Sequence, residues 1–228
     1  MLQEVGNSNT TYLSIVGGNM VQKVDEDHPD ARKREYETSD GAKGTKWEKS
    51  WRNLSGFITG IDFEKSNFGT QVRLTLQKGE ERVILSFPYE SDYFTDFAKR
   101  ICGADLTKEV VINPYAMTVE GKEYKKRGIS LKQDGEKLGN YFFDFDKKKS
   151  LHGFPEVSAS DRKNYDSDSW KLFFLTVRAF LKKKVQELVI PEYTPQAGGG
   201  SLDTPSEPAA KEENQEKELP FLKGRKKK

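Results

Sequence analysis

Alternating hydrophobic and polar residues predict three successive strands in the middle of the chain. The alternation is clearest over residues 70–76 and 82–87, and a β-rich segment at 54–62 precedes them. Residues 91–102 instead place their apolar side chains at helical spacing, and Gly103 follows as a stop signal. Further strand patterns predict a fourth strand and a final strand or hairpin, at residues 109–112, 116–120 and 124–131.

Three strands, a helix and two more strands are the element order of an OB-fold, a partly open five-stranded barrel. The sequence therefore predicts a mainly β fold, a five-stranded OB-fold-like barrel with one helix between its third and fourth strands. A longer apolar stripe predicts an added C-terminal amphipathic helix over residues 168–188, packed on the barrel. The basic residues on its other side form either a solvated face or a contact for phosphates: Lys171, Arg178, Lys182 and Lys183.

The chain divides into an N-terminal strand with a charged arm, the barrel, the C-terminal helix and a disordered tail, at residues 1–50, 51–150, 151–193 and 194–228. An apolar run at 12–16 in the first zone could pair as an extra strand within the barrel or with a second copy. The Gly, Ser, Pro, Glu and Lys content of the last zone is typical of a disordered tail. This tail is acidic from Asp203 to Glu218 and basic over its last six residues.

The composition of the 228 residues narrows the class of protein. Hydrophobic residues make up 34% and charged residues 32%, which is more polar than an ordinary enzyme. No apolar stretch reaches the length of a membrane span, and the N-terminus lacks a signal-peptide pattern. Because Cys102 is the single cysteine and only two histidines accompany it, Cys/His zinc sites are excluded. We therefore expect a soluble, cytoplasmic protein.

Residues typical of catalysis are scarce. Nucleophilic catalysis needs a base beside a serine or cysteine, but His28 lies in an acidic polar segment and His152 precedes a glycine in a predicted loop. The nucleophile-elbow and P-loop motifs are both missing from the sequence. We therefore predict a protein that is not an enzyme and needs no cofactor or metal.

Lysines and arginines interleaved with aromatic residues favour nucleic-acid binding. Proteins that bind single strands combine a cationic groove with flat side chains on which bases stack. The predicted phosphate and polar contacts are Lys65, Gln71, Arg73, Lys122, Lys126 and Arg127. The predicted stacking residues are Trp47, Phe68, Tyr115 and Tyr124. In the alternative interpretation, these aromatic side chains pack in the core or in turns and the lysines only keep the protein soluble.

The segment from Trp47 to about Glu136 resembles the single-stranded DNA-binding proteins of tailed bacteriophages. Four features carry the resemblance: a Gly60-Ile61 strand end, residues 67–71 (Asn-Phe-Gly-Thr-Gln), residues 113–115 (Asn-Pro-Tyr) and residues 128–135 (Gly-Ile-Ser-Leu-Lys-Gln-Asp-Gly). The resemblance implies an OB-fold that coats exposed single strands during replication and recombination, with no catalysis.

The tail is also similar to that of bacterial and phage single-strand binders, which often end in acidic residues and a Pro-Phe pair that docks on replication partners. The matching residues are Glu216, Glu218, Leu219, Pro220 and Phe221. Here seven further residues follow Phe221, and five of them are basic, so the usual docking through a terminal carboxylate is in doubt.

These observations favour a single-stranded DNA-binding protein of low sequence specificity, with an acidic tail for replication or recombination proteins. The alternative is a virion or assembly component that uses the barrel as a protein-interaction module. The net charge of only +2 favours this alternative, because strong non-specific DNA binders are usually more basic. Steep salt dependence of oligonucleotide binding would separate the two. The preference for DNA or RNA, the site size and the oligomeric state stay open.

Overall fold

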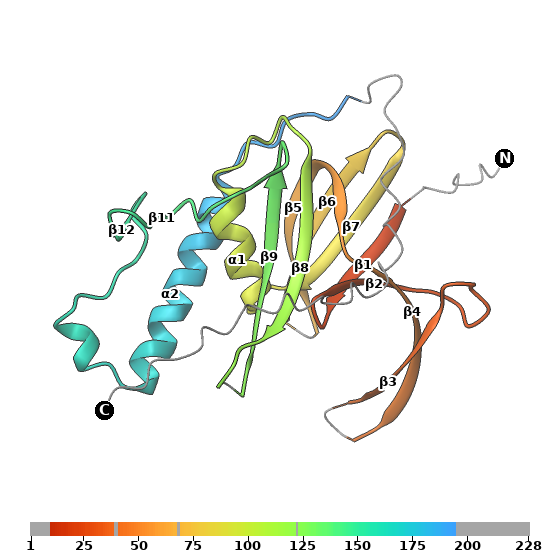
Figure 1. Ribbon diagram of the computed structural model, residues 1–228, viewed down its shortest axis with the longest axis horizontal. Coiled ribbons are helices and arrows are strands. Elements are labelled where there is room, and N and C mark those ends of the chain that lie inside the picture. The colour runs from red at the N-terminus through yellow and green to blue at the C-terminus, as the bar shows by residue number, and fades with distance from the viewer. Residues whose placement is uncertain (1–9, 39–40, 68, 122, 195–228) are drawn as a thin grey trace, which may run out of the picture.

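The computed structural model describes residues 10–38, 41–67, 69–121 and 123–194. Within these ranges the chain forms a ten-stranded mixed sheet, a two-stranded sheet, two α-helices and a short 3-10 helix (Figure 1). The strands of the large sheet are β1 (Thr10–Val16), β2 (Asn19–Lys23), β3 (Arg32–Glu37), β4 (Lys43–Trp51), β5 (Leu54–Ser66), β6 (Gly69–Lys78), β7 (Glu81–Pro88), β8 (Val110–Thr118), β9 (Lys125–Gln133) and β10 (Glu136–Lys137). The remaining elements are α1 (Asp92–Ile101), β11 (Phe143–Asp144), β12 (Lys149–Ser150), the 3-10 helix (Asp161–Lys163) and α2 (Ser167–Gln186).

The strand order is β10-β9-β8-β5-β6-β7-β1-β2-β4-β3, and the sheet is not closed into a barrel. The prediction of a five-stranded OB-fold-like barrel is therefore wrong. Its expected strands and helix are present in the expected sequence order, as β5, β6, β7, α1, β8 and β9. The difference arises at β7, whose free edge pairs in parallel with β1, Thr10 lying opposite Arg82. The sheet then continues through β2, β4 and β3.

The segment expected to be a charged arm contains a two-stranded ribbon, β3 and β4, which extends beyond β2 (Figure 1). Its cross-strand contacts are mostly polar. The Arg34 guanidinium donates to both carboxylate oxygens of Glu48 at 2.7 and 2.6 Å, and Glu48 is only 7% exposed. Tyr36 lies over Gly44, with Lys46 Nζ 4.7 Å from the centre of its ring. Such pairs stabilise a hairpin without producing the hydrophobic alternation by which strands are recognised in sequence.

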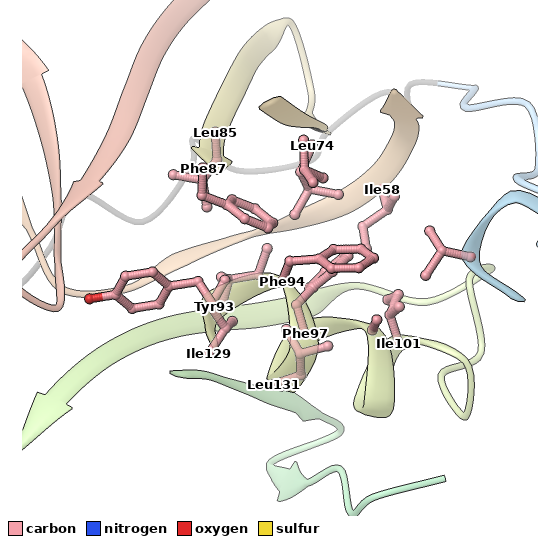
Figure 2. Close-up of a cluster of buried hydrophobic side chains, with 14 of the residues drawn as sticks. Ile58, Leu74, Leu85, Phe87, Tyr93, Phe94, Phe97, Ile101, Ile129 and Leu131 are labelled. Atoms are coloured by element: carbon pink, nitrogen blue, oxygen red, sulfur yellow. The ribbon is translucent and has the colours of Figure 1, made fainter. Parts of the chain in front are cut away.

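The core lies between α1 and one face of the sheet. Ser91 caps α1, which buries Phe94, Phe97 and Ile101. These side chains face the alternating apolar residues of the strands, among them Leu74, Leu85, Phe87, Ile129 and Leu131 (Figure 2). The expected alternation in the strands and the expected helix are thus both confirmed, and together they fix which face of the sheet is covered.

The second helix, α2, packs along α1 on the side away from the sheet (Figure 1). Asp166 caps its N-terminus, and Val177, Leu181 and Val185 are buried. Its span agrees with the helix predicted over residues 168–188 to within two residues at each end. Nothing among the described residues forms a helix long and apolar enough to cross a membrane.

Candidate nucleic-acid interface

The face of the sheet opposite α1 carries a polar surface, which we call the open face. Successive side chains of a strand point to opposite faces, so the residues between the core positions of β1, β6 and β7 point away from α1. On these three strands the open face includes Tyr12, Gln71, Arg73, Arg82 and Ser86. On the neighbouring strand β5, Asp62 and Glu64 lie on the same face, opposite Arg73 and Gln71. Tyr12 is 60% exposed, although it lies in the middle of a strand. An exposed aromatic ring on an open sheet face is the geometry on which unpaired bases stack.

The two arginines of the open face lie in rows on either side of Tyr12. Arg73 is opposite Ser86, and its guanidinium lies 2.7 Å from the Glu64 carboxylate. Both partners of this ion pair are about half exposed, so the pair is weak and a phosphate can compete for the arginine. Arg82 has no carboxylate within ion-pair distance among the described residues.

A second basic surface lies where β9 begins, and we call it the β8–β9 end. It comprises Met117, Tyr124, Lys125, Lys126 and Arg127. All five are exposed, Met117 by 50% and Tyr124 by 61%. No carboxylate of the described chain lies within ion-pair distance of the three cations. An anionic ligand can therefore pair with them without breaking an ion pair, although the adjoining turn also carries Glu120 and Glu123.

The ribbon carries an aromatic ring beside a lysine on each of its faces. On one face Trp47 is half-buried opposite Lys33, and Lys49 Nζ lies 4.5 Å from the centre of the Trp51 ring. On the other face Lys46 lies over Tyr36. Lysines thus lie beside aromatic rings on both faces of the ribbon, and Trp47, a predicted stacking residue, is only partly exposed.

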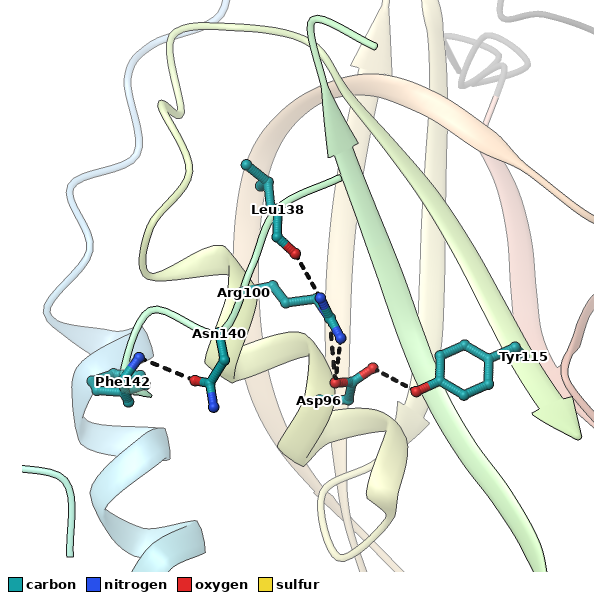
Figure 3. A network of polar contacts seen from close by, with 6 residues as sticks. All are labelled: Asp96, Arg100, Tyr115, Leu138, Asn140 and Phe142. Atoms are coloured by element: carbon teal, nitrogen blue, oxygen red, sulfur yellow. Dashed lines mark hydrogen bonds and ion pairs between the residues drawn. The ribbon is translucent and has the colours of Figure 1, made fainter. Parts of the chain in front are cut away.

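Tyr115 is held inside a polar network. Its hydroxyl donates to Asp96 Oδ2 at 3.1 Å, and Arg100 donates to Asp96 Oδ1 and to the carbonyl of Leu138 (Figure 3). Burial, together with the neighbouring Asp96 carboxylate that accepts this hydrogen bond, raises the pKa of Tyr115 to about 12. The ring also lies over Gly128, whose missing side chain leaves room for it. Tyr115 thus joins β8, β9 and α1, and this anchoring role competes with the predicted stacking on bases.

The raised pKa of Tyr115 makes stability depend on alkaline pH. The native pKa of about 12 is above the ordinary value of 10.0, so the contribution is complete below about pH 10 and is lost as the pH rises toward 12. We expect Tyr115→Phe to reduce the fall in the free energy of unfolding between these pH values. Urea denaturation at several pH values measures this fall in wild type and in Tyr115→Phe, and Tyr12→Phe serves as the control. The same pH dependence in wild type and both variants would contradict the assignment.

The remaining predicted residues are spread out. Lys65 is exposed at the end of β5, opposite Thr70 and two residues beyond Phe63, whose ring packs at the core, so it lies on the other face from Arg73. Phe68, Lys122 and the tail residues Glu216, Glu218, Leu219, Pro220 and Phe221 lie outside the described residues. Of the other predicted residues, Gln71 and Arg73 meet on the open face, and Tyr124, Lys126 and Arg127 meet at the β8–β9 end.

Sequence reasoning missed Tyr12 and Arg82. A signal was present, because Leu13 and Ile15 alternate with Tyr12 and Ser14 in β1. That alternation places Tyr12 on the face opposite the core. Residues 12–16 were interpreted as one apolar run, which hid the alternation. Arg82 lies in a strand that was predicted correctly, on the face opposite Val83, Leu85 and Phe87, but it was not singled out because the strand that carries Tyr12 was not expected beside it.

Groups of the kinds used in catalysis were also located. Burial raises the pKa of the Cys102 thiol to about 11, so at neutral pH it is protonated and a weak nucleophile. The His152 ring stacks on Tyr141, with 4.0 Å between ring centres. In the part of the chain that the structure describes, no group of three or more His, Cys, Asp or Glu residues is placed to hold a metal ion.

Comparisons with known proteins complete this description. No protein-family description, no curated protein and no solved structure matches this chain. The candidate interface thus consists of an exposed tyrosine and two arginines on the open face, together with the basic ribbon and the basic β8–β9 end.

Proposed function

We propose that this protein binds single-stranded DNA with little sequence preference and without catalysis. One observation carries the proposal: Tyr12 stands exposed on the open face, between rows that hold Arg73 and Arg82. Stacking of a base on an aromatic side chain contributes roughly 1 to 3 kcal/mol and tolerates any base, because every base has a π-face. The arginines supply charge for the phosphates on either side of the stacked base.

The two basic hairpins support the same function. In Figure 1 the ribbon and the β8–β9 end both project from the lower side of the molecule. A strand bound on the open face could continue onto either of them and meet further cations, Lys46 on the ribbon or Lys126 at the β8–β9 end. Stacking on Tyr12 requires an unpaired base, since the bases of a duplex already stack on one another. The arrangement therefore favours single strands over duplexes.

The biological setting is also part of the proposal. The likeness of residues 47–136 to phage single-stranded DNA-binding proteins suggests that the protein coats single strands during replication or recombination, in the cytoplasm of the host cell. The acidic tail sequence that ends in Leu219, Pro220 and Phe221 suggests contact with replication or recombination proteins. The likeness also implied an OB-fold barrel, which the structure contradicts, so the biological setting rests on the sequence features alone.

Fluorescence anisotropy tests the proposed activity. A labelled oligo(dT) of about 30 nucleotides and a matched duplex are titrated at about 50 mM and about 300 mM salt. We expect tight binding of the single strand, much weaker binding of the duplex and a steep loss of affinity at the higher salt concentration. No binding of the single strand at low salt would overturn the proposal and favour a protein-interaction module.

Tyr12 gives a sharper prediction. Tyr12→Ala should weaken binding of oligo(dT) by about 5- to 150-fold, the equivalent of one lost stacking interaction. Tyr12→Phe is the matched control, because it keeps the ring and removes only the hydroxyl, and it should bind within about twofold of wild type. The same anisotropy titration measures both. Equal affinity of Tyr12→Ala and Tyr12→Phe would show that no base stacks at this position.

A further inference from the structure

The helix α2 has a second apolar stripe that the described part of the chain leaves exposed. Val177, Leu181 and Val185 pack against the rest of the protein, whereas Leu172 and Leu175 are 66% and 53% exposed. The exposed pair is followed one helical turn later by Ala179, which is also exposed. Residues spaced by three and four lie on the same side of a helix, so these three form a continuous stripe.

The charges at the two ends of this stripe have opposite signs. Asp168 lies on the same side as Leu175, seven residues before it, and Lys182 lies seven residues after it. Lys183 follows and is exposed, whereas the Lys182 ammonium lies 4.9 Å from the centre of the Phe63 ring. Asp168 is also paired with Lys171 at 2.8 Å, but both side chains are largely exposed and such a pair is weak, so the carboxylate can exchange partners. The stripe thus carries a carboxylate at the N-terminal end of the helix and lysines at the C-terminal end.

We propose that this stripe binds the same stripe of a second copy of the chain, with the two helices antiparallel and the two-fold axis near Leu175. This arrangement places the Asp168 end of each helix beside the Lys183 end of the other. It also brings the two Leu175 side chains together and places Leu172 of each copy beside Ala179 of the other. A parallel arrangement would instead bring like charges together at both ends. The stripe is therefore self-complementary in one orientation only, as a two-fold interface requires.

The size of the interface predicts its strength. One helix face from each copy buries less surface than a stable interface of about 1,600 Å². We therefore expect a weak dimer that dissociates on dilution. The inference does not rest on nucleic-acid binding, because α2 lies on the opposite side of the core from the open face (Figure 1).

Sedimentation velocity of the full-length chain, without DNA, tests the proposal over about 5 to 300 μM protein. Wild type should shift from monomer to dimer across this range, and Leu175→Glu should raise the dissociation constant at least about tenfold. Val189→Glu is the matched control, because Val189 is 87% exposed and lies beyond α2, and it should dimerise like wild type. A wild-type monomer at every concentration, or equal dimerisation of Leu175→Glu and wild type, would overturn the proposal.

A charge exchange tests the antiparallel orientation. Asp168→Lys alone should weaken the dimer, because two basic ends then face each other. Adding Lys183→Asp should restore the affinity to within a few-fold, because each acidic end again faces a basic one. Circular dichroism confirms that both variants keep their helix. If the double variant associates no better than Asp168→Lys alone, the antiparallel arrangement is wrong.

Discussion

Reversing the charge of the β8–β9 end should weaken binding of single-stranded DNA by about 100-fold or more at low salt. The triple variant Lys125→Glu, Lys126→Glu and Arg127→Glu removes three cations that face no carboxylate in the described part of the chain. It also adds three charges that repel phosphate. Each lost phosphate contact lowers the slope of log affinity against log salt by about 0.7, so the slope should fall by about 2. Anisotropy titrations at several salt concentrations measure both effects.

The control for this variant makes the same change of charge elsewhere. Lys147, Lys148 and Lys149 are exposed in and beside β12, which lies near α2 and away from the β8–β9 end (Figure 1). Their triple replacement by glutamate should reduce affinity only through the net charge, by less than about tenfold. Similar losses in the two triple variants would show that overall charge, and not the β8–β9 end, governs binding.

The second large effect concerns stability, and Gly18→Val should lower the free energy of unfolding by roughly 3 kcal/mol or more. Gly18 lies in the turn between β1 and β2, where φ is +87°. A Cβ atom there would overlap the backbone nitrogen of Ala116 and lie 2.8 Å from the carbonyl carbon of Tyr115, both in β8. Neither atom belongs to a flexible side chain that can move aside. Urea denaturation measures the loss.

The neighbouring glycine provides the control for this effect. Gly17 also has a positive φ, +59°, but no atom lies within 4 Å of the position a Cβ would take. Gly17→Ala should therefore cost only the left-handed backbone penalty, about 1 kcal/mol. If Gly17→Ala and Gly18→Val destabilise the protein equally, the close contact between the β1–β2 turn and β8 does not contribute.

Local sequence patterns were sufficient to predict the strands and the helix that bury one of their faces. The alternation in β6 and β7 and the helical spacing in α1 were readable because Leu74, Leu85 and Phe97 all enter the same core. The pairing of strands was not readable, because β1 joins β7 across some 70 residues of sequence and any exposed edge could have accepted it. This long-range choice turned the predicted five-stranded barrel into a ten-stranded sheet.

The candidate site was predictable to a similar extent. Basic residues near a hairpin turn, such as Lys126 and Arg127, are exposed almost wherever the hairpin packs, so their location at a free end was foreseeable. Aromatic residues are less certain, because one ring can stack on a base or fill a gap in the fold. Tyr115 spans β8, β9 and α1, whereas Tyr12 is exposed. Which of the two rings is anchored and which is exposed depends on where α1 packs.

The central claim is that single-stranded DNA lies on the open face and continues onto the basic hairpins. Ultraviolet crosslinking of the full-length protein to oligo(dT), followed by mapping of the crosslinked peptides, tests it most directly. We predict crosslinks at Tyr12 and at one or both of the ribbon and the β8–β9 end, all lost when unlabelled single strand competes. Crosslinks confined to α2, or no crosslink at Tyr12 under conditions of saturated binding, would contradict the claim.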